Sequence, residues 1–126
     1  IKAGKVTAMH DPTEGGLSSA LWELSQASNT SLVINPQTVY VPPLSRRICQ
    51  TLGLNPLAAI ASGALLLTAS EHTCGNICRA LESENILCKE IGFVESGPTA
   101  VWQETGSGRQ PLPLPDRDEI AKIFEE

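Results

Sequence analysis

The chain has 126 residues, 41% of them hydrophobic, which is enough to bury the core of one globular domain. Its formal net charge is −5 and its nine basic residues are scattered, so we expect a small metabolite or a protein as partner, and no nucleic acid or membrane surface. No apolar run approaches the ~20 residues of a membrane span, and no basic-then-apolar leader is present, which predicts a cytoplasmic protein. Because the start IKAGKVTAM has no initiator Met, we expect a piece cut from a longer protein.

The first half of the chain predicts strands and helices in alternation. Residues 5–10, KVTAMH, predict a short strand, and from Leu17 apolar residues recur with helical spacing until a polar stretch begins. SLVIN, residues 31–35, is β-branched and predicts a second strand. A helix is predicted over about 44–52, with prolines at its entry and Gly53 at its exit.

The second half predicts three more strands and two more helices. SGALLLTAS, residues 62–70, is a continuous apolar run and predicts a central strand covered on both faces. A helix is expected over 71–84 and a strand over 86–94. TAVWQET, 99–105, alternates in part, as an edge or half-exposed strand does. GSGRQ after it predicts a turn, and 116–124 a final helix. This order predicts an α/β or α+β fold with helices packed on a sheet.

The four cysteines could be free thiols, disulfides or a metal site. Two of them share an apolar helical stripe with two aliphatic residues, at positions 74, 77, 78 and 81. The short spacing typical of zinc ligands is absent. We therefore expect no metal site, and free, mostly buried thiols at all four positions, Cys49, Cys74, Cys78 and Cys88.

The segment HDPTEGG, residues 10–16, lies between the first predicted strand and helix. A helix N-terminus with small residues favours a phosphate or carboxylate, and Gly15 and Gly16 would let a ligand come close. The alternative is structural: Asp11 and Thr13 cap the helix, and the glycines permit close packing of helix on sheet. The segment is neither a Walker loop nor a dinucleotide fingerprint.

Two expectations concern residues of this turn. If Gly16 has the ordinary dihedral angles of a first helical turn, Gly16→Val weakens ligand binding more than it lowers the melting temperature. His10, beside the turn, is a candidate ligand contact or a hydrogen-bonded structural residue, whereas His72 is expected on the surface.

Three segments carry a resemblance to a known family: VTAMHDPTEGGLSSALWELSQAS, ICQTLGLNPLAAIASGALLLTA and IGFV. The pairing of Asp-Pro-Thr-x-Gly-Gly-Leu with Leu-Gly-Leu-x-Pro-Leu is its most specific part. Together they resemble the C-terminal domain of the aminoimidazole ribonucleotide (AIR) synthase, or PurM-like, superfamily, over about Lys5 to Phe124. Within it, the sequence is most similar to AIR synthase-related proteins and to the hydrogenase maturation protein HypE.

The resemblance implies an α+β fold, a three-layer α/β/α sandwich partly like ferredoxin, with residues 1–126 as one domain. It implies a two-domain, usually dimeric enzyme whose N-terminal domain supplies the ATP site. This domain would then need no cofactor of its own, while ATP and Mg²⁺ act in the full-length protein. Its partners would be its own N-terminal domain, a second copy, and a small anionic substrate or nucleotide. The residues implied to face substrate or phosphates are Asp11, Thr13, Gly15, Gly16, Ser62 and Gly63.

Two features depart from HypE. HypE ends in a Pro-Arg-x-Cys tail whose cysteine carries the carbamoyl group, whereas this chain ends DEIAKIFEE, and Ala61-Ser62-Gly63-Ala64 replaces a charged Asn-Glu-Gly-Lys-like turn. Both favour the AIR synthase-related group. Three functions stay open: a substrate-binding domain of an ATP-dependent enzyme, inactive alone; a non-catalytic interaction module or HypE-like domain; and a metal-binding domain that uses the thiols.

Overall fold

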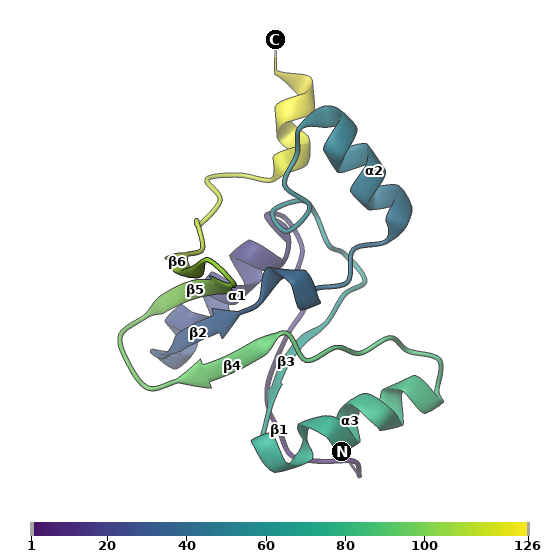
Figure 1. The fold of residues 1–126 in the computed structure, drawn as a ribbon, viewed down its shortest axis with the longest axis vertical. Helices are drawn as coiled ribbons and strands as arrows, with labels where there is room; N and C mark the ends of the chain where they lie inside the picture. Colours follow the sequence, from purple (N-terminus) through teal and green to yellow (C-terminus); the bar gives the residue numbers. More distant parts are fainter. Residues whose placement is uncertain (1, 126) are drawn as a thin grey trace.

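A computed structural model describes residues 2–125 and shows a mixed α+β fold (Figure 1). In this part of the chain no helix has the length and apolar character needed to cross a membrane. In chain order the elements are β1 Val6–His10, α1 Gly16–Ser28, β2 Ser31–Ile34, the 3₁₀ turn η1 Pro36–Thr38, α2 Pro43–Leu52, β3 Leu66–Ala69, α3 Glu71–Ser83, β4 Gly92–Glu95, β5 Ala100–Thr105, β6 Gly108–Pro111 and the 3₁₀ helix η2 Glu119–Phe124.

Within residues 2–125 the strands divide between two sheets. β1 pairs antiparallel with β3, so that His10 lies opposite Leu66. The other sheet has the order β4-β2-β5-β6, in which β2 runs parallel to β5 and antiparallel to β4. Helix α1 packs on β2 and β5, while α2 and α3 lie at opposite ends of the molecule (Figure 1).

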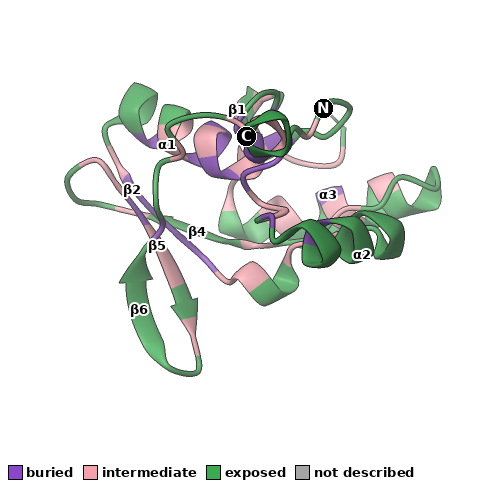
Figure 2. Cartoon of the chain, turned by 90° about the horizontal axis from the view of Figure 1, so that it is seen from above, coloured by how far each residue is buried: buried purple, intermediate pink, exposed green. Residues whose placement is uncertain are grey.

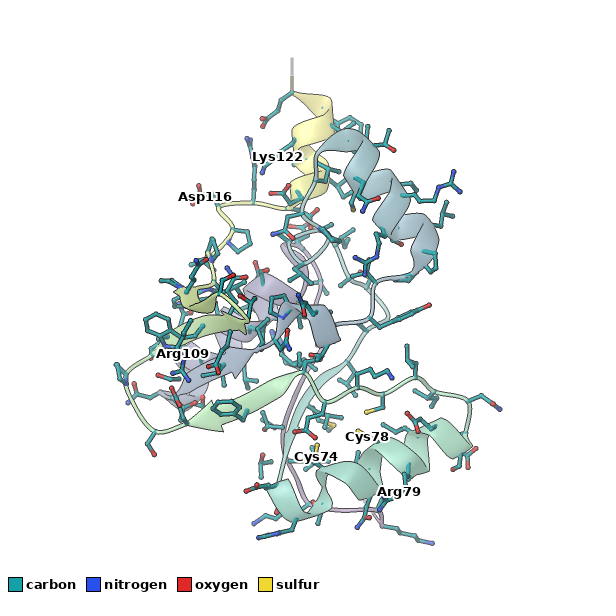
Figure 3. All side chains as sticks on the ribbon, viewed as in Figure 1. Cys74, Cys78, Arg79, Arg109, Asp116 and Lys122 are labelled. Carbon is teal, nitrogen blue, oxygen red and sulfur yellow. The ribbon has the colours of Figure 1, made fainter. Side chains whose placement is uncertain are left out.

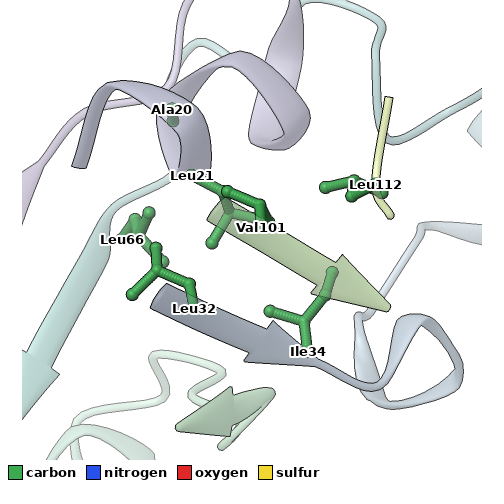
Figure 4. Packing of buried hydrophobic residues seen from close by; sticks show 7 residues of the cluster. All are labelled: Ala20, Leu21, Leu32, Ile34, Leu66, Val101 and Leu112. Atoms are coloured by element: carbon green, nitrogen blue, oxygen red, sulfur yellow. The ribbon is translucent and has the colours of Figure 1, made fainter. Parts of the chain in front are cut away.

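The core lies between α1 and the larger sheet (Figure 4). β2 is buried at all four positions, as its β-branched and aliphatic sequence predicts. Each fully buried aliphatic side chain contributes about 1.5–3 kcal/mol. The cluster consists of Ala20, Leu21, Leu32, Ile34, Leu66, Val101 and Leu112. By contrast, α2 and α3 are largely exposed (Figure 2).

The predicted places of two strands are wrong. The run 62–70 is not a central strand: β3 covers only its C-terminal part, belongs to the two-stranded sheet and is mostly half-buried. For 99–105 the edge position is wrong, because β5 lies between β2 and β6. The half-exposed alternative agrees with the structure, since Val101 is buried but four of the six residues of β5 are half-buried. Its outer partner β6 forms from residues that the sequence predicts as a turn.

Other predicted bounds were closer. The helices over 44–52 and 71–84 and the strands over 5–10 and 31–35 are confirmed near their predicted bounds. The strand expected over 86–94 begins only at Gly92. The expected helix over 116–124 is the shorter 3₁₀ helix η2.

Ser25 links the C-terminal part of α1 to β5 by a hydrogen bond of its side chain. Its side chain is completely buried, and its Oγ donates to the carbonyl of Thr30 at 2.6 Å and accepts from the amide of Ala100 at 3.1 Å. One hydroxyl therefore satisfies backbone groups at the start of β2 and at the start of β5. This explains a polar residue on the otherwise apolar inner face of α1.

We predict that Ser25→Ala lowers the free energy of unfolding by about 1–3 kcal/mol, because the Ala100 amide and the Thr30 carbonyl lose their buried partner. Ser28→Ala removes an exposed hydroxyl from the same helix and should change stability by less than about 0.5 kcal/mol. Urea unfolding of the two variants measures the difference. Equal effects would show that the Ser25 hydroxyl contributes nothing specific.

Candidate functional site

The turn between β1 and α1 lies against the segment that precedes β3. The carbonyl of Thr13 accepts from the amide of Gly16 at 3.0 Å and from the amide of Ala61 at 3.3 Å. The structure thus brings together the two turns that the sequence singles out, residues 10–16 and 61–64. Whether they bind a ligand depends on which of their polar groups are accessible.

Gly16 is required by backbone packing. It has φ +61°, and a Cβ there would lie 2.3 Å from the carbonyl oxygen of Ala59. The neighbouring Ser18 amide donates to the carbonyl of Leu57 at 2.8 Å, so the start of α1 is in direct backbone contact with this segment. The expectation of ordinary helical dihedral angles at Gly16 is therefore wrong, because only glycine takes this conformation without strain.

A carboxylate from the C-terminal part of the chain occupies the N-terminus of α1. The amide of Gly15 donates to Oδ2 of Asp118 at 2.7 Å, while Oδ1 of Asp118 accepts from Ile120 at 2.9 Å and caps η2. The helix dipole favours a negative group at this position. The sequence contains no local signal for this contact between residues 103 positions apart. The acidic residues at the start of the last predicted helix indicate that one of them caps this helix. They do not indicate that Asp118 also binds the amide of Gly15.

Asp11, Thr13 and Ser62 are exposed at this end of the molecule. Neither Asp11 nor Thr13 caps α1, whose N-cap is Gly15 without a side-chain hydrogen bond, so the capping alternative is wrong. Gly63 is also exposed, and a Cβ there would meet open space. The side chains of Asp11, Thr13 and Ser62 make no hydrogen bond within residues 2–125, which leaves them accessible to a ligand.

The two histidines have different surroundings. His10 is half-buried, and its Nε2 contacts the carboxylate of Glu23 on α1. This contact ties the end of β1 to the helix. His72 is exposed in the first turn of α3, as expected.

Glu119 links η2 to the segment before β3 by hydrogen bonds. Its carboxylate accepts from the amide of Asn55 at 3.1 Å and from the Lys122 ammonium, and its own amide donates to the carbonyl of Ala58 at 3.1 Å. The hydrogen bond from Lys122, followed by that from the Asn55 amide, lowers the pKa of Glu119. The C-terminal segment is thus part of the framework that holds the site.

Two hollows of the surface lie away from these residues. One, of about 600 Å³, is lined by residues 4–9, and the other, of about 470 Å³, by residues of β2, β4, β5 and neighbouring loops. Neither is lined by the turns at 10–16 and 61–64.

All four cysteines are free thiols. Cys49 is buried, but Cys74, Cys78 and Cys88 are only half-buried, so the expectation of mostly buried thiols is wrong for these three. Figure 3 shows Cys74 and Cys78 on the same side of α3. Burial, followed by a hydrogen bond with Cys78, raises the pKa of Cys88 to about 11. Within residues 2–125 no group of His, Cys, Asp and Glu is arranged to hold a metal ion.

Comparison with known proteins identifies the family. The model of the family described as AIR synthase related protein, C-terminal domain, matches residues 1–103. The chain belongs to this family. A Methanocaldococcus jannaschii protein named for hydrogenase expression and formation is 30% identical over 122 residues, which are 94% of this chain and 36% of that protein. Carbamoyl dehydratase HypE of Cupriavidus necator is 32% identical over 87 residues, 69% of this chain and 22% of HypE.

Solved structures agree with this assignment of the AIR synthase-related domain. The crystal structure of hydrogenase maturation protein HypE in complex with ATP has a TM-score of 0.82 at 26% identity, covering 92% of this chain and 38% of that one. Escherichia coli HypE has a TM-score of 0.83 at 26% identity, with coverage of 95% and 38%. The chain therefore spans little more than a third of these relatives.

We predict that Gly16→Ala destabilises the domain much more than Gly53→Ala. The two glycines have nearly the same φ, +61° and +65°, but a Cβ at Gly53 meets nothing within 4 Å. Gly53→Ala should therefore cost only the left-handed conformation, about 1–2 kcal/mol, and Gly16→Ala at least about twice that. Urea unfolding gives both values, and equal losses would contradict the packing role of Gly16.

We predict that Glu119 makes the domain less stable in acid. Because its pKa is lowered on folding, its stabilisation is present above the unfolded pKa of about 4.5 and is lost as the pH falls through the lower folded pKa. Glu119→Gln should lower the melting temperature at neutral pH and flatten its fall below about pH 4.5. Glu84→Gln, at an exposed position, is the control, and melting curves across this range compare the two. A profile for Glu119→Gln parallel to that of the wild type would exclude the linkage.

Proposed function

We propose that the chain is the C-terminal domain of an ATP-dependent AIR synthase-related enzyme, that residues 1–126 form this single domain, and that it is inactive without a preceding ATP-binding domain. The likeness to HypE in complex with ATP, over 92% of this chain but only 38% of that protein, carries the proposal. The domain itself would be a three-layer α/β/α sandwich, partly like ferredoxin, and the full-length protein a homodimer. The partners of this domain are then its own N-terminal domain, a second copy and a small anionic substrate or nucleotide.

The accessible side chains at the two joined turns support a role in binding substrate or nucleotide. The amides of Gly15, Gly16 and Ser18 are bonded inside the chain, which leaves the side chains of Asp11, Thr13 and Ser62 as candidate contacts. Hydroxyls donate to phosphate oxygens, whereas a carboxylate repels phosphate unless a cation lies between them. Mg²⁺ with a nucleotide is commonly held by one or two carboxylates plus the phosphates, which fits Asp11 as an oxygen ligand. His10 would support this end of β1 through Glu23.

A HypE-like role in hydrogenase maturation is the second candidate. It rests on the names of the relatives, among them the M. jannaschii protein that aligns with 94% of this chain. A HypE–HypF complex, 20% identical, shares the fold with a TM-score of 0.79. The alternative to both enzymatic roles is a non-catalytic module that keeps the fold and binds a protein partner.

We predict that Asp11→Asn and Thr13→Ala each lower kcat/KM for ATP turnover by the full-length protein by about 10-fold or more, as expected for the loss of one charge-assisted contact. The melting temperature should stay nearly unchanged, because neither side chain is bonded within the described residues. Asp116→Asn, at an exposed acid (Figure 3), is the matched control and should leave turnover intact. The 126-residue chain alone should turn over no ATP.

Three results would contradict the proposal in different ways. Turnover by the isolated chain would show that it carries the catalytic machinery itself. An unchanged kcat/KM in both Asp11→Asn and Thr13→Ala would show that neither side chain takes part in the site. A full-length protein that neither binds nor hydrolyses ATP would favour the interaction module.

A further inference from the structure

Helix α3 is attached to the domain by few buried contacts. Ile77 is its only buried residue among those described. At its C-terminal end Asn85 takes the left-handed conformation, with φ +60°, and the amide of Ile86 donates to the carbonyl of Leu81 at 2.9 Å. The chain therefore reverses, and residues 84–91 return past α3 toward β4 without regular secondary structure (Figure 1).

This reversal brings two thiols into contact. Sγ of Cys78 on α3 lies 3.4 Å from Sγ of Cys88 on the returning segment. A disulfide bond is about 2.05 Å long, so the sulfurs must approach by only roughly 1.4 Å. The segment that carries Cys88 has no strand ladder to resist this shift, and both residues are half-buried, so a small reagent can reach them.

We propose that Cys78 and Cys88 form a redox-active dithiol, which a low-molecular-weight disulfide converts into an intrachain disulfide that clamps α3 to the returning segment. The proposal does not depend on the ATP-dependent function argued above. Cys49 is buried in α2, and Cys74 lies one helical turn before Cys78 on α3. Cys74 is the competing thiol, because Cys78 contributes, after burial and Glu90, to its raised pKa, and the 3.4 Å contact between Cys78 and Cys88 is the observation that favours Cys88.

The exchange balances in two steps. The Cys78 thiolate attacks one sulfur of the small disulfide, whose S–S bond breaks, and the displaced thiolate leaves with the electron pair and takes up a proton. Cys88 then loses its proton and attacks Sγ of Cys78, displacing the second small thiol. Two protein thiols are oxidised, and one small disulfide is reduced to two thiols.

The surroundings of the thiols affect how fast they exchange. Burial, followed by the hydrogen bond with Cys78, raises the pKa of Cys88 to about 11, and burial with the nearby Glu90 raises the pKa of Cys74. The same raised pKa makes exchange slow at neutral pH, because the thiolate is the reactive form.

The test is oxidation of the full-length protein with oxidised glutathione, followed by alkylation and peptide mapping. We expect one peptide that joins Cys78 to Cys88 and that dithiothreitol separates. Hydrogen exchange of the α3 amides should slow in the oxidised protein, because the closed loop removes open states of the helix. The melting temperature of the region that contains α3 should rise by about 5–10 °C on oxidation.

Single Cys→Ser variants identify which two cysteines form the disulfide. Cys78→Ser and Cys88→Ser should each abolish the cross-link and the added protection, whereas Cys49→Ser and Cys74→Ser should retain both. A bond to Cys74 in the wild type, mixed glutathione adducts alone, or a Cys78–Cys88 bond without slower exchange in α3 would each overturn the proposal. If a variant fails to fold, the peptide map and hydrogen exchange of the wild type still decide it.

Discussion

The backbone contact between the start of α1 and residues 57–61 is the constraint on which this end of the domain depends. Gly16 takes a left-handed conformation there, which favours glycine. In addition, any side chain at this position would collide with the carbonyl oxygen of Ala59. The same contact aligns the Ser18 amide with Leu57 and the Thr13 carbonyl with Ala61. One conformationally demanding residue thus fixes the end of β1, the start of α1 and the segment before β3 relative to one another.

That constraint changes what the N-terminus of α1 can do. The amides of Gly15, Gly16 and Ser18 are bonded inside the chain, and Asp118 supplies the negative group that the helix dipole favours, a contribution of about 0.3–1 kcal/mol. An external anion at Gly15 would have to displace this carboxylate and compete with its cap of η2. Recognition by exposed side chains therefore costs the fold less than recognition by the amides.

Features set by local sequence were predictable, and features set by distant partners were not. Helical spacing located α1 and α3, prolines followed by Gly53 located α2, and β-branched residues located β2. The apolar run 62–70 has no period that indicates a face, and its Leu65 is 58% exposed because only Leu66 reaches the core. The central place of β5 depends on β6, whose polar residues give no strand signal. The Asp-Pro-Thr turn was located correctly, but the Asp118 contact joins residues 103 positions apart.

The β1–β3 ladder connects the candidate site with the end of the molecule that carries α3. At one end His10 pairs with Leu66 beside the candidate site, and at the other Val6 pairs with Ala69 just before α3. There the amide of Ser70 donates to the carbonyl of Lys5 at 3.2 Å, and Gly4 packs against Thr73 of α3. Since each strand has only one partner within residues 2–125, the ladder's order depends on what holds its two ends. How firmly α3 is held therefore bears directly on how well β1 presents His10 and the turn that follows it.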